Sequence, residues 1–202
     1  MDAPVAPVVG ILLAAGRGRR FDPAGQRNKL LQPLADGEPV VAACARKLLA
    51  ATSRVVAVVA PGGDRVGALL GALGCDVTVC PDADGGMAAS LTHALRHSLA
   101  LSSEPAPRAW LVALGDMPYV DGLTLRALAA ALAAGADIAA PVVEGRRGNP
   151  VGFGAVHLEA LLALRGDAGA RHLLRMFQVT EVAVSDPGIL RDIDVPGDLS
   201  GT

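Results

Sequence analysis

Six short apolar runs, each typical of a β-strand buried on both faces, alternate with helical patterns along this chain. The runs cover residues 8–13, 54–60, 76–79, 109–114, 137–143 and 179–184. Between them, apolar residues recur at helical spacing, as in Val66, Leu69, Leu70 and Leu73. Alternation of strand and helix favours right-handed crossovers and a parallel sheet. We therefore expect an α/β fold of three layers, Rossmann-like, with a mainly parallel sheet and helices on both faces.

Residues 144–154 interrupt this alternation. Four glycines and one proline surround a short apolar pair there: Gly145, Gly148, Pro150, Gly152 and Gly154. Such a pattern predicts a hairpin-like excursion, which we expect to form a wall of a substrate cleft near the acceptor site. A chain of 202 residues lies within the range of one domain, so we expect a single domain over residues 1–202.

Composition excludes several classes of protein. The net charge of −2 provides no overall positive field, which argues against a nucleic-acid partner. The three cysteines are odd in number and lack C-x-x-C spacing, so we expect neither a disulfide framework nor a zinc site, and a reducing, cytoplasmic location. The longest apolar stretch, 123–143, is interrupted by Arg126, Asp137 and Pro141, so we expect no membrane span.

The first apolar run leads directly into a glycine-containing, strongly cationic loop. Its small residues, Ala14, Ala15, Gly16 and Gly18, allow backbone N–H groups to approach an anion. Its positive residues are Arg17, Arg19, Arg20, Arg27 and Lys29. Arginines in surface loops are often merely solvated, but open α/β sheets bind ligands at the carboxyl ends of their strands. The loop therefore predicts a site for a nucleoside triphosphate.

Two familiar nucleotide-binding motifs are missing from the sequence. The loop lacks the third glycine of the dinucleotide fingerprint, and the pattern G-x-x-x-x-G-K-[ST] does not occur. Neither an NAD(P) enzyme nor a P-loop NTPase is favoured.

Two aspartates are candidate metal ligands. Asp116 follows the fourth apolar run, where a carboxylate can hold Mg²⁺ opposite a phosphate loop, although this segment taken alone favours a turn or a helix N-cap. Asp192 and Asp194 alternate on an extended segment and share one face. Asp194 is either a second metal ligand or the cap of a terminal helix.

Two further segments are candidate ligand contacts. Gly85 and Gly86 precede an amphipathic helix whose free N–H groups, with the Ser90 hydroxyl, can bind a base, ribose or phosphate; ordinary helix capping is the alternative. Arg171 either meets an anionic substrate or lies on a helix surface.

Taken together, the motifs resemble those of the molybdenum-cofactor cytidylyltransferase family (MocA-like and MobA-like) within the nucleotidyltransferase superfamily. The family opening L-A-A-G-x-G/S-x-R, followed by a lysine, is met by residues 13–20 and Lys29. Further matches are G-M-x-x-S-L at 86–91, G-D-M-P at 115–118, R-G-N-P-V at 147–151, G-D-x-G-A-R at 166–171 and D-I-D-x-P-x-D-L at 192–199. The link at 21–28 is longer than the usual one.

The resemblance implies the nucleotide-diphospho-sugar transferase type of fold and Mg²⁺-dependent transfer of CMP from CTP to a phosphorylated acceptor, molybdopterin, with release of pyrophosphate. CTP is favoured because guanylyl-transferring relatives usually read L-A-G-G where this chain has Ala15. A molybdoenzyme or a chaperone is the implied protein partner.

The resemblance also implies roles for individual residues. The catalytic set is Arg20, Lys29 and Asp116, and the metal ligands are Asp116 and Asp194. The acceptor would be bound by Arg147, Asn149 and Arg171. The nucleotide would be bound by Leu13, Ala14, Ala15, Gly16, Gly18, Lys29, Gly85, Gly86 and Ser90.

Three other functions remain open at this point. Methylerythritol-phosphate cytidylyltransferases also begin L-A-A-G, but they usually carry G-G-x-x-R-x-x-S-V and D-A-A-R where this chain has residues 85–91 and 115–118. Another small phosphate is an alternative acceptor. A non-enzymatic alternative is a nucleotide-binding sensor or cofactor chaperone.

Overall fold

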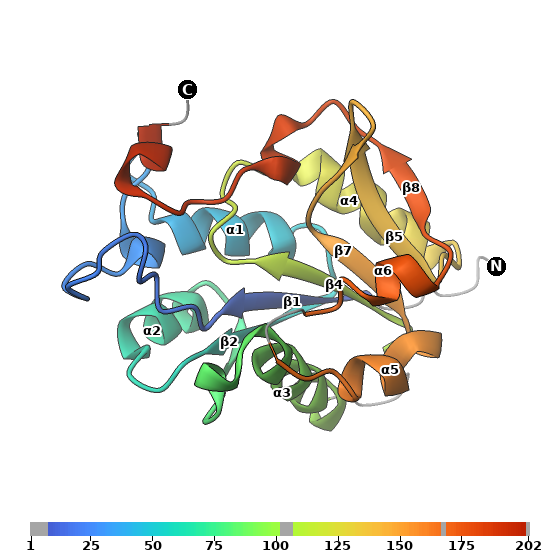
Figure 1. Cartoon of the computed structure of the whole chain (residues 1–202), viewed down its shortest axis with the longest axis horizontal. Coiled ribbons are helices and arrows are strands. Elements are labelled where there is room, and N and C mark those ends of the chain that lie inside the picture. Colours follow the sequence, from blue (N-terminus) through green and yellow to red (C-terminus); the bar gives the residue numbers. More distant parts are fainter. Residues whose placement is uncertain (1–7, 102–106, 167–168, 201–202) are drawn as a thin grey trace.

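A computed structural model describes residues 8–101, 107–166 and 169–200 of the chain. They form an eight-stranded sheet in the order β3-β2-β1-β4-β7-β5-β6, with β8 paired to β5 (Figure 1). The strands are β1 (Val8–Ala14), β2 (Arg54–Val59), β3 (Asp76–Val79), β4 (Ala109–Leu114), β5 (Ile138–Val143), β6 (Arg146–Arg147), β7 (Val151–Gly154) and β8 (Thr180–Ala183). All six predicted strands are confirmed, each to within one residue at either end.

Most strand pairs are parallel. Strand β1 lies between β2 and β4 and is parallel to both. Strand β3 pairs in parallel with β2, and β8 pairs in parallel with β5. Strand β7 runs antiparallel to both β4 and β5, and β6 runs antiparallel to β5. The carboxyl ends of β1, β2, β4 and β5 therefore reach the same edge of the sheet.

Helices cover both faces of the sheet, which confirms the predicted α/β class. Helices α1 (Val40–Leu49), α2 (Asp64–Ala72) and α4 (Gly122–Ala133) pack on one face. Helices α3 (Met87–Ala100), α5 (Leu158–Leu162) and α6 (Leu173–Met176) pack on the other. In Figure 1, α1 and α4 lie above the sheet and α3 and α5 below it.

Alternate residues of each central strand belong to opposite core layers. In β1, Leu12 joins the layer that contains Leu48 of α1, whereas Ile11 joins the layer that contains Leu95 of α3. All four side chains are fully buried. Burial on both faces explains why these strands read as continuous apolar runs instead of alternating patterns.

The segment 144–154 is a hairpin only in its first part. Glu144 and Gly145 have φ values of 49° and 72°, as a tight turn between β5 and β6 requires. Residues 151–154, which the sequence analysis included in the excursion, instead form β7 in the middle of the sheet. A Cβ on Gly152 would lie 2.4 Å from Leu132 of α4, so the glycine permits the close approach of that helix.

None of the helices in the described residues has both the length and the apolar character that a membrane span requires.

Candidate active site

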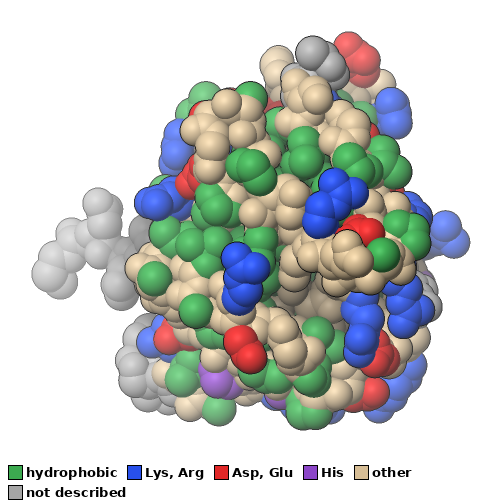
Figure 2. All heavy atoms as spheres, turned by 90° about the vertical axis from the view of Figure 1, so that its left-hand side faces the viewer, with side chains coloured by type: hydrophobic (Ala, Val, Ile, Leu, Met, Phe, Trp, Pro, Cys, Tyr) green, Lys and Arg blue, Asp and Glu red, His purple; other side chains and the backbone are tan. Residues whose placement is uncertain are grey.

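The loops that follow β1, β2 and β4 meet at the carboxyl edge of the sheet. A cleft of about 650 Å³ opens between the first two of these loops. Figure 2 faces this edge and shows Lys and Arg side chains distributed over it, with acidic side chains beside them. The cleft is lined by Ala14, Ala15, Gly16, Arg17, Arg19, Asp22, Pro23, Ala24, Gly25, Arg27, Asn28, Ala60, Pro61, Gly62, Gly63 and Val66.

Lys29 is the centre of the charged cluster beside this cleft. Its side chain is 9% exposed, and its Nζ donates to Asp116 Oδ2 at 2.5 Å and to the carbonyl oxygen of Ile193 at 2.9 Å. Asp194 Oδ1 lies 3.8 Å from the same nitrogen. One buried ammonium group therefore joins the β1 loop, the β4 loop and the C-terminal segment, and it brings together three of the predicted site residues.

Backbone contacts set the position of these side chains. Gly18 has a φ of +59°, and a Cβ there would lie 3.3 Å from Lys29 Cγ, so the turn packs against the lysine stem. The N–H of Ile193 donates to the carbonyl oxygen of Asp116 at 2.8 Å. The Ile193 side chain is buried with Phe21 and Val40, which anchors the C-terminal segment that carries Asp194.

The long link at 21–28 forms a compact turn of its own. The carboxylate of Asp22 accepts the backbone N–H groups of Arg27 at 2.6 Å and of Ala24 at 3.2 Å. The Arg27 N–H is the largest influence that lowers the pKa of Asp22. Asn28 then caps the short 3-10 helix η1 (Lys29–Leu31) by accepting from the Leu30 N–H. The longer link therefore still places the Lys29 side chain beside Asp116.

The arginines of the loop differ in their contacts. Arg20 pairs with Asp194, and its side chain is 78% exposed. Arg17 makes a bidentate pair with Asp84, at 2.6 and 2.5 Å. Arg17, Arg19 and Arg27 line the cleft, whereas Arg20 does not.

The predicted contacts around Gly85 lie outside the lining of the cleft. Gly86 has a φ of 95° and precedes α3, and the Ser90 side chain is buried. Asp84 of this segment lies in the short 3-10 helix η2 (Ala83–Gly85), and its ion pair with Arg17 links the segment to the β1 loop.

The three predicted acceptor residues lie in different local surroundings. Arg147 pairs with Glu181 at 2.6 Å, and the Asn149 N–H donates to the carbonyl oxygen of Ile189 at 2.9 Å. Arg171 is exposed just before α6. Within the described ranges, no hydrogen bond or ion pair joins these three residues to one another.

Asp194 was expected to be either a metal ligand or a helix cap, and the hydrogen bonds of the C-terminal segment bear on the second of these roles. The carboxylate of Asp198, not that of Asp194, accepts the N–H groups of Asp194 and Val195, both at 2.8 Å. The Val195 N–H is the largest influence that lowers the pKa of Asp198. The Asp194 carboxylate is left to face Lys29 and Arg20.

The donor set fits Mg²⁺. Within the described part of the chain, no group of three or more His, Cys, Asp or Glu side chains is arranged to hold a metal. Asp116 and Asp194 nevertheless converge on a single nitrogen atom. Two carboxylates are what Mg²⁺ takes from a protein when substrate phosphates and water complete its shell.

Sequence reasoning missed two parts of this cluster. The backbone of Ile193 contacts both Lys29 and Asp116, and Asp84 holds Arg17. The alternation Asp192-Ile193-Asp194 was a usable signal for the first, because it turns Ile193 inward opposite the two carboxylates. Asp84 carries no comparable local signal.

Residues 10–183 match the family model of the MobA-like NTP transferase domain. The chain belongs to this family. The match runs from Gly10 in β1 to the end of β8 and includes both Lys29 and Asp116, and it confirms the expected superfamily.

Solved structures support the same relationship. The crystal structure of Rv0371c from Mycobacterium tuberculosis H37Rv is 28% identical, with a TM-score of 0.79 and 95% of each chain covered. Its manganese complex has a TM-score of 0.71 at 27% identity, covering 96% of this chain and 93% of that one. A nucleotidyl transferase from Methanothermobacter thermautotroptrophicus is 27% identical, with a TM-score of 0.76 and coverage of 95% and 94%.

A curated relative gives a partial match. The bifunctional protein GlmU of Bradyrhizobium sp. (strain ORS 278) is 32% identical over 181 residues, which is 86% of this chain. The chain spans 38% of the length of that relative.

Proposed function

We propose that this chain transfers CMP from CTP to a phosphorylated acceptor, molybdopterin, with release of pyrophosphate. The observation that carries the proposal is the buried Lys29 ammonium, which is shared by Asp116 and Asp194 beside a cleft at the carboxyl edge of the sheet. Membership of the MobA-like NTP transferase family supports the nucleotidyl transfer. The resemblance of the motifs to the cytidylyltransferases supports the choice of CTP and of molybdopterin.

In this proposal, a phosphate oxygen of the acceptor attacks the α-phosphorus of CTP in line. A new bond forms between that oxygen and the α-phosphorus, and the bond from the α-phosphorus to the oxygen that bridges to the β-phosphorus breaks. Pyrophosphate leaves with the electron pair. Such transfers depend on positioning and charge neutralisation more than on covalent chemistry by the protein.

The chain supplies both requirements. Ala15, Gly16 and Arg17 line the cleft, and backbone N–H groups between Ala15 and Gly18 are proposed to cradle the triphosphate. Lys29 and Arg20 are proposed to offset the charge that accumulates during transfer. Asp116 and Asp194 would hold Mg²⁺, which supplies positive charge to the phosphate oxygens when bound. The manganese complex of Rv0371c supports a divalent metal in this family.

Ala15 supports a cytosine base. It lines the cleft, and we propose that its methyl group lies beside the base. A larger purine would need more space there, which agrees with the glycine of the guanylyl-transferring relatives. We propose that Ala15 contributes to the preference for CTP.

The β5–β6 hairpin supports an acceptor site at the same edge. Strand β5 ends at this edge because it runs parallel to β4, with β7 antiparallel between them. Arg147 follows the hairpin turn and Asn149 lies just beyond it. We propose that these two residues, with Arg171, bind the phosphorylated acceptor. Residues Gly85, Gly86 and Ser90 are proposed to complete the nucleotide site when CTP displaces the contact between Arg17 and Asp84.

The cellular setting is proposed from the state of the cysteines. Cys44, Cys75 and Cys80 are all free and buried, which supports a reducing compartment such as the cytoplasm. A molybdoenzyme or its chaperone is the proposed recipient of the product.

The test is magnesium-dependent release of pyrophosphate with CTP, GTP, ATP and UTP, each with molybdopterin or methylerythritol phosphate as acceptor. We expect CTP with molybdopterin to be the most active pair. If pyrophosphate release is fastest with methylerythritol phosphate, that compound replaces molybdopterin as the proposed acceptor. Binding of CTP without pyrophosphate release for any acceptor would point to a sensor or chaperone.

A matched pair of variants tests the base preference. Ala15→Gly is expected to raise the ratio of GTP to CTP turnover, because it removes the methyl group from the wall of the cleft. Ala24→Gly, in another part of the same lining, is the control and is expected to leave the ratio unchanged.

A further inference from the structure

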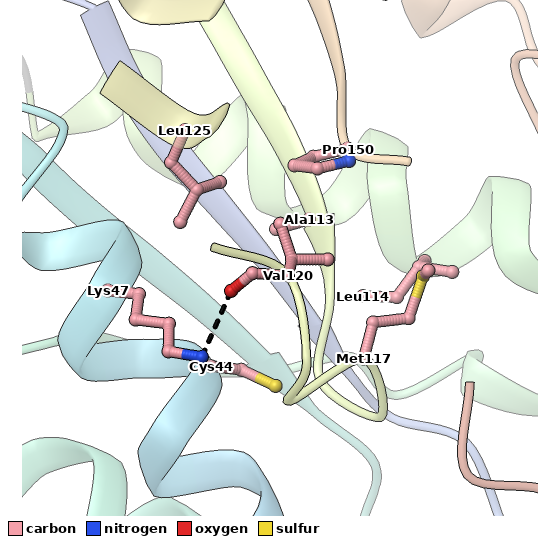
Figure 3. Close-up of a pocket in the computed structure, with 8 residues that line it drawn as sticks. All are labelled: Cys44, Lys47, Ala113, Leu114, Met117, Val120, Leu125 and Pro150. Carbon is pink, nitrogen blue, oxygen red and sulfur yellow. Dashed lines mark hydrogen bonds between the residues drawn. The ribbon is translucent and has the colours of Figure 1, made fainter. Parts of the chain in front are cut away.

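The loop that carries Asp116 lies over a small internal cavity. Residues 115–120 connect β4 to α4, and a void of about 20 Å³ lies beneath them. That volume holds about one water molecule. The lining is mostly apolar and comes from α1, β4, α4, the loop itself and the residue before β7: Cys44, Lys47, Ala113, Leu114, Met117, Val120, Leu125 and Pro150 (Figure 3). The Met117 and Val120 side chains of the loop are buried in the core, and the void lies between them and α1.

Helix α1 also supports the loop by hydrogen bonds to its backbone. Lys47 Nζ donates to the carbonyl oxygen of Pro118 at 2.6 Å and to that of Val120 at 3.0 Å. Figure 3 shows the second of these bonds, which crosses from α1 to the far end of the loop. Cys44, one helical turn earlier, donates from Sγ to the carbonyl oxygen of Gly115 at 3.4 Å. The beginning, middle and end of the loop are thus all attached to one helix.

The charge of Lys47 is used in an unusual way. Among the described residues, no carboxylate lies within ion-pair distance of Lys47, and Lys47 Nζ donates to two neutral carbonyl groups. The neighbouring Arg46 is exposed and pairs with Glu38 at 2.8 Å in the ordinary manner of a surface cation. Bonds from a charged donor are stronger than bonds between neutral groups, so Lys47 is suited to hold the backbone of this loop in place.

The loop sets the direction of the Asp116 carboxylate. Asp116 follows Gly115, whose carbonyl oxygen receives the Cys44 bond, and precedes the Pro118 and Val120 carbonyls that Lys47 holds. On the opposite side, the Asp116 carboxylate meets Lys29 at 2.5 Å. A displacement of the loop by about 1 Å would spoil such a contact.

We propose that Lys47 is a positioning residue for the transfer reaction, holding the 115–120 loop so that the Asp116 carboxylate faces Lys29 and the metal. This inference rests on the proposed function of Asp116. Lys47 acts through the loop and is not expected to touch either substrate. Its loss should therefore affect turnover and metal binding more than the binding of CTP.

The experiment compares Lys47→Met with Arg46→Met, its exposed neighbour on the same helix, in the full-length protein. We measure kcat and KM for CTP by pyrophosphate release, and Mn²⁺ affinity by electron paramagnetic resonance without nucleotide. Residues that orient a metal ligand typically contribute a factor of about 10 or more in activity or metal affinity. We expect Lys47→Met to lose about tenfold in kcat and in Mn²⁺ affinity with little change in KM, and Lys47→Arg to recover part of both losses.

Equal kcat and equal Mn²⁺ affinity in Lys47→Met and Arg46→Met would overturn the inference. Failure of the wild-type protein to release pyrophosphate would overturn the proposed function, while the Mn²⁺ comparison would still decide the role of Lys47. If Lys47→Met does not fold, Cys44→Ala removes the third attachment of the loop and is expected to weaken Mn²⁺ binding. Wild-type Mn²⁺ affinity in both Cys44→Ala and Lys47→Arg would then count against the inference.

Discussion

Replacement of Lys29 by methionine removes a charge that two carboxylates share, while it keeps a side chain of similar length. In the native protein the Lys29 ammonium lies 2.5 Å from Asp116 Oδ2 and 3.8 Å from Asp194 Oδ1. In Lys29→Met, Arg20 still pairs with Asp194, but Asp116 loses its cation. Two different consequences follow, one for catalysis and one for metal binding.

The catalytic consequence is a large loss of rate. A charged contact aimed at developing negative charge is typically worth about 3 kcal/mol, which corresponds to a rate factor on the order of a hundred. The effect on folding should be smaller. The Asp116 and Asp194 side chains are 22% and 27% exposed, so water moderates their repulsion and we expect a loss of about 1 to 2 kcal/mol.

The consequence for metal binding has the opposite sign. Lys29 and a divalent cation compete for the same Asp116 carboxylate. The loss of the Lys29 ammonium should therefore tighten Mn²⁺ binding while turnover falls. Pyrophosphate release measures the first effect and paramagnetic resonance the second. The control is Arg54→Met at the amino end of β2, where an exposed arginine pairs with Asp76 at 3.3 Å. Turnover of Lys29→Met within about threefold of this control would refute the assignment of Lys29 to the reaction.

Three further predictions concern stability and reactivity. Gly188→Ala should lower the free energy of unfolding in urea by at least about 2 kcal/mol, because a Cβ there would lie 2.1 Å from the carbonyl oxygen of Tyr119, whereas Gly197→Ala, at a position with open space, should be neutral. Burial, helped by the charges of His97 and Arg96, lowers the pKa of His93 below its ordinary 6.5. As the pH falls, the unfolded chain therefore takes up the His93 proton before the folded protein does, so the stability of the folded protein should decrease as the pH drops below 6.5. In thermal unfolding, His93→Gln should show a smaller decrease of stability over this pH range. The same pH dependence in the variant and the native protein would contradict the reasoning. Burial raises the pKa of the Cys44 thiol to about 12 and that of Cys75 to about 11, so a thiol-titrating reagent near pH 8 should leave both unmodified in the folded protein and react with all three cysteines in denaturant.

The sequence was sufficient for most of the fold. Strands such as β1 and β4 consist mainly of Val, Leu, Ile and Ala, and α2 and α4 repeat their apolar residues at helical spacing. These signals are local, because burial on two faces or on one stripe is written into neighbouring residues. Strand β7 has no such signal. Two of its four residues are glycines, and it takes its central place because Gly152 admits Leu132 of α4.

The candidate site divides in the same way. Lys29, Asp116 and Asp194 were predicted from motifs that follow strands or lie on an extended segment, and parallel strands carry such residues to one edge. The tertiary structure alone decided that one ammonium group would join both carboxylates, that Ile193 would tie the three segments together, and that Asp198 would do the capping. It also decided that Lys47, which is 71 residues from Pro118 in sequence, would support the loop that carries Asp116. Local periodicity carries no information about such contacts, since they depend on which backbone carbonyl groups packing brings within about 3 Å of a side chain.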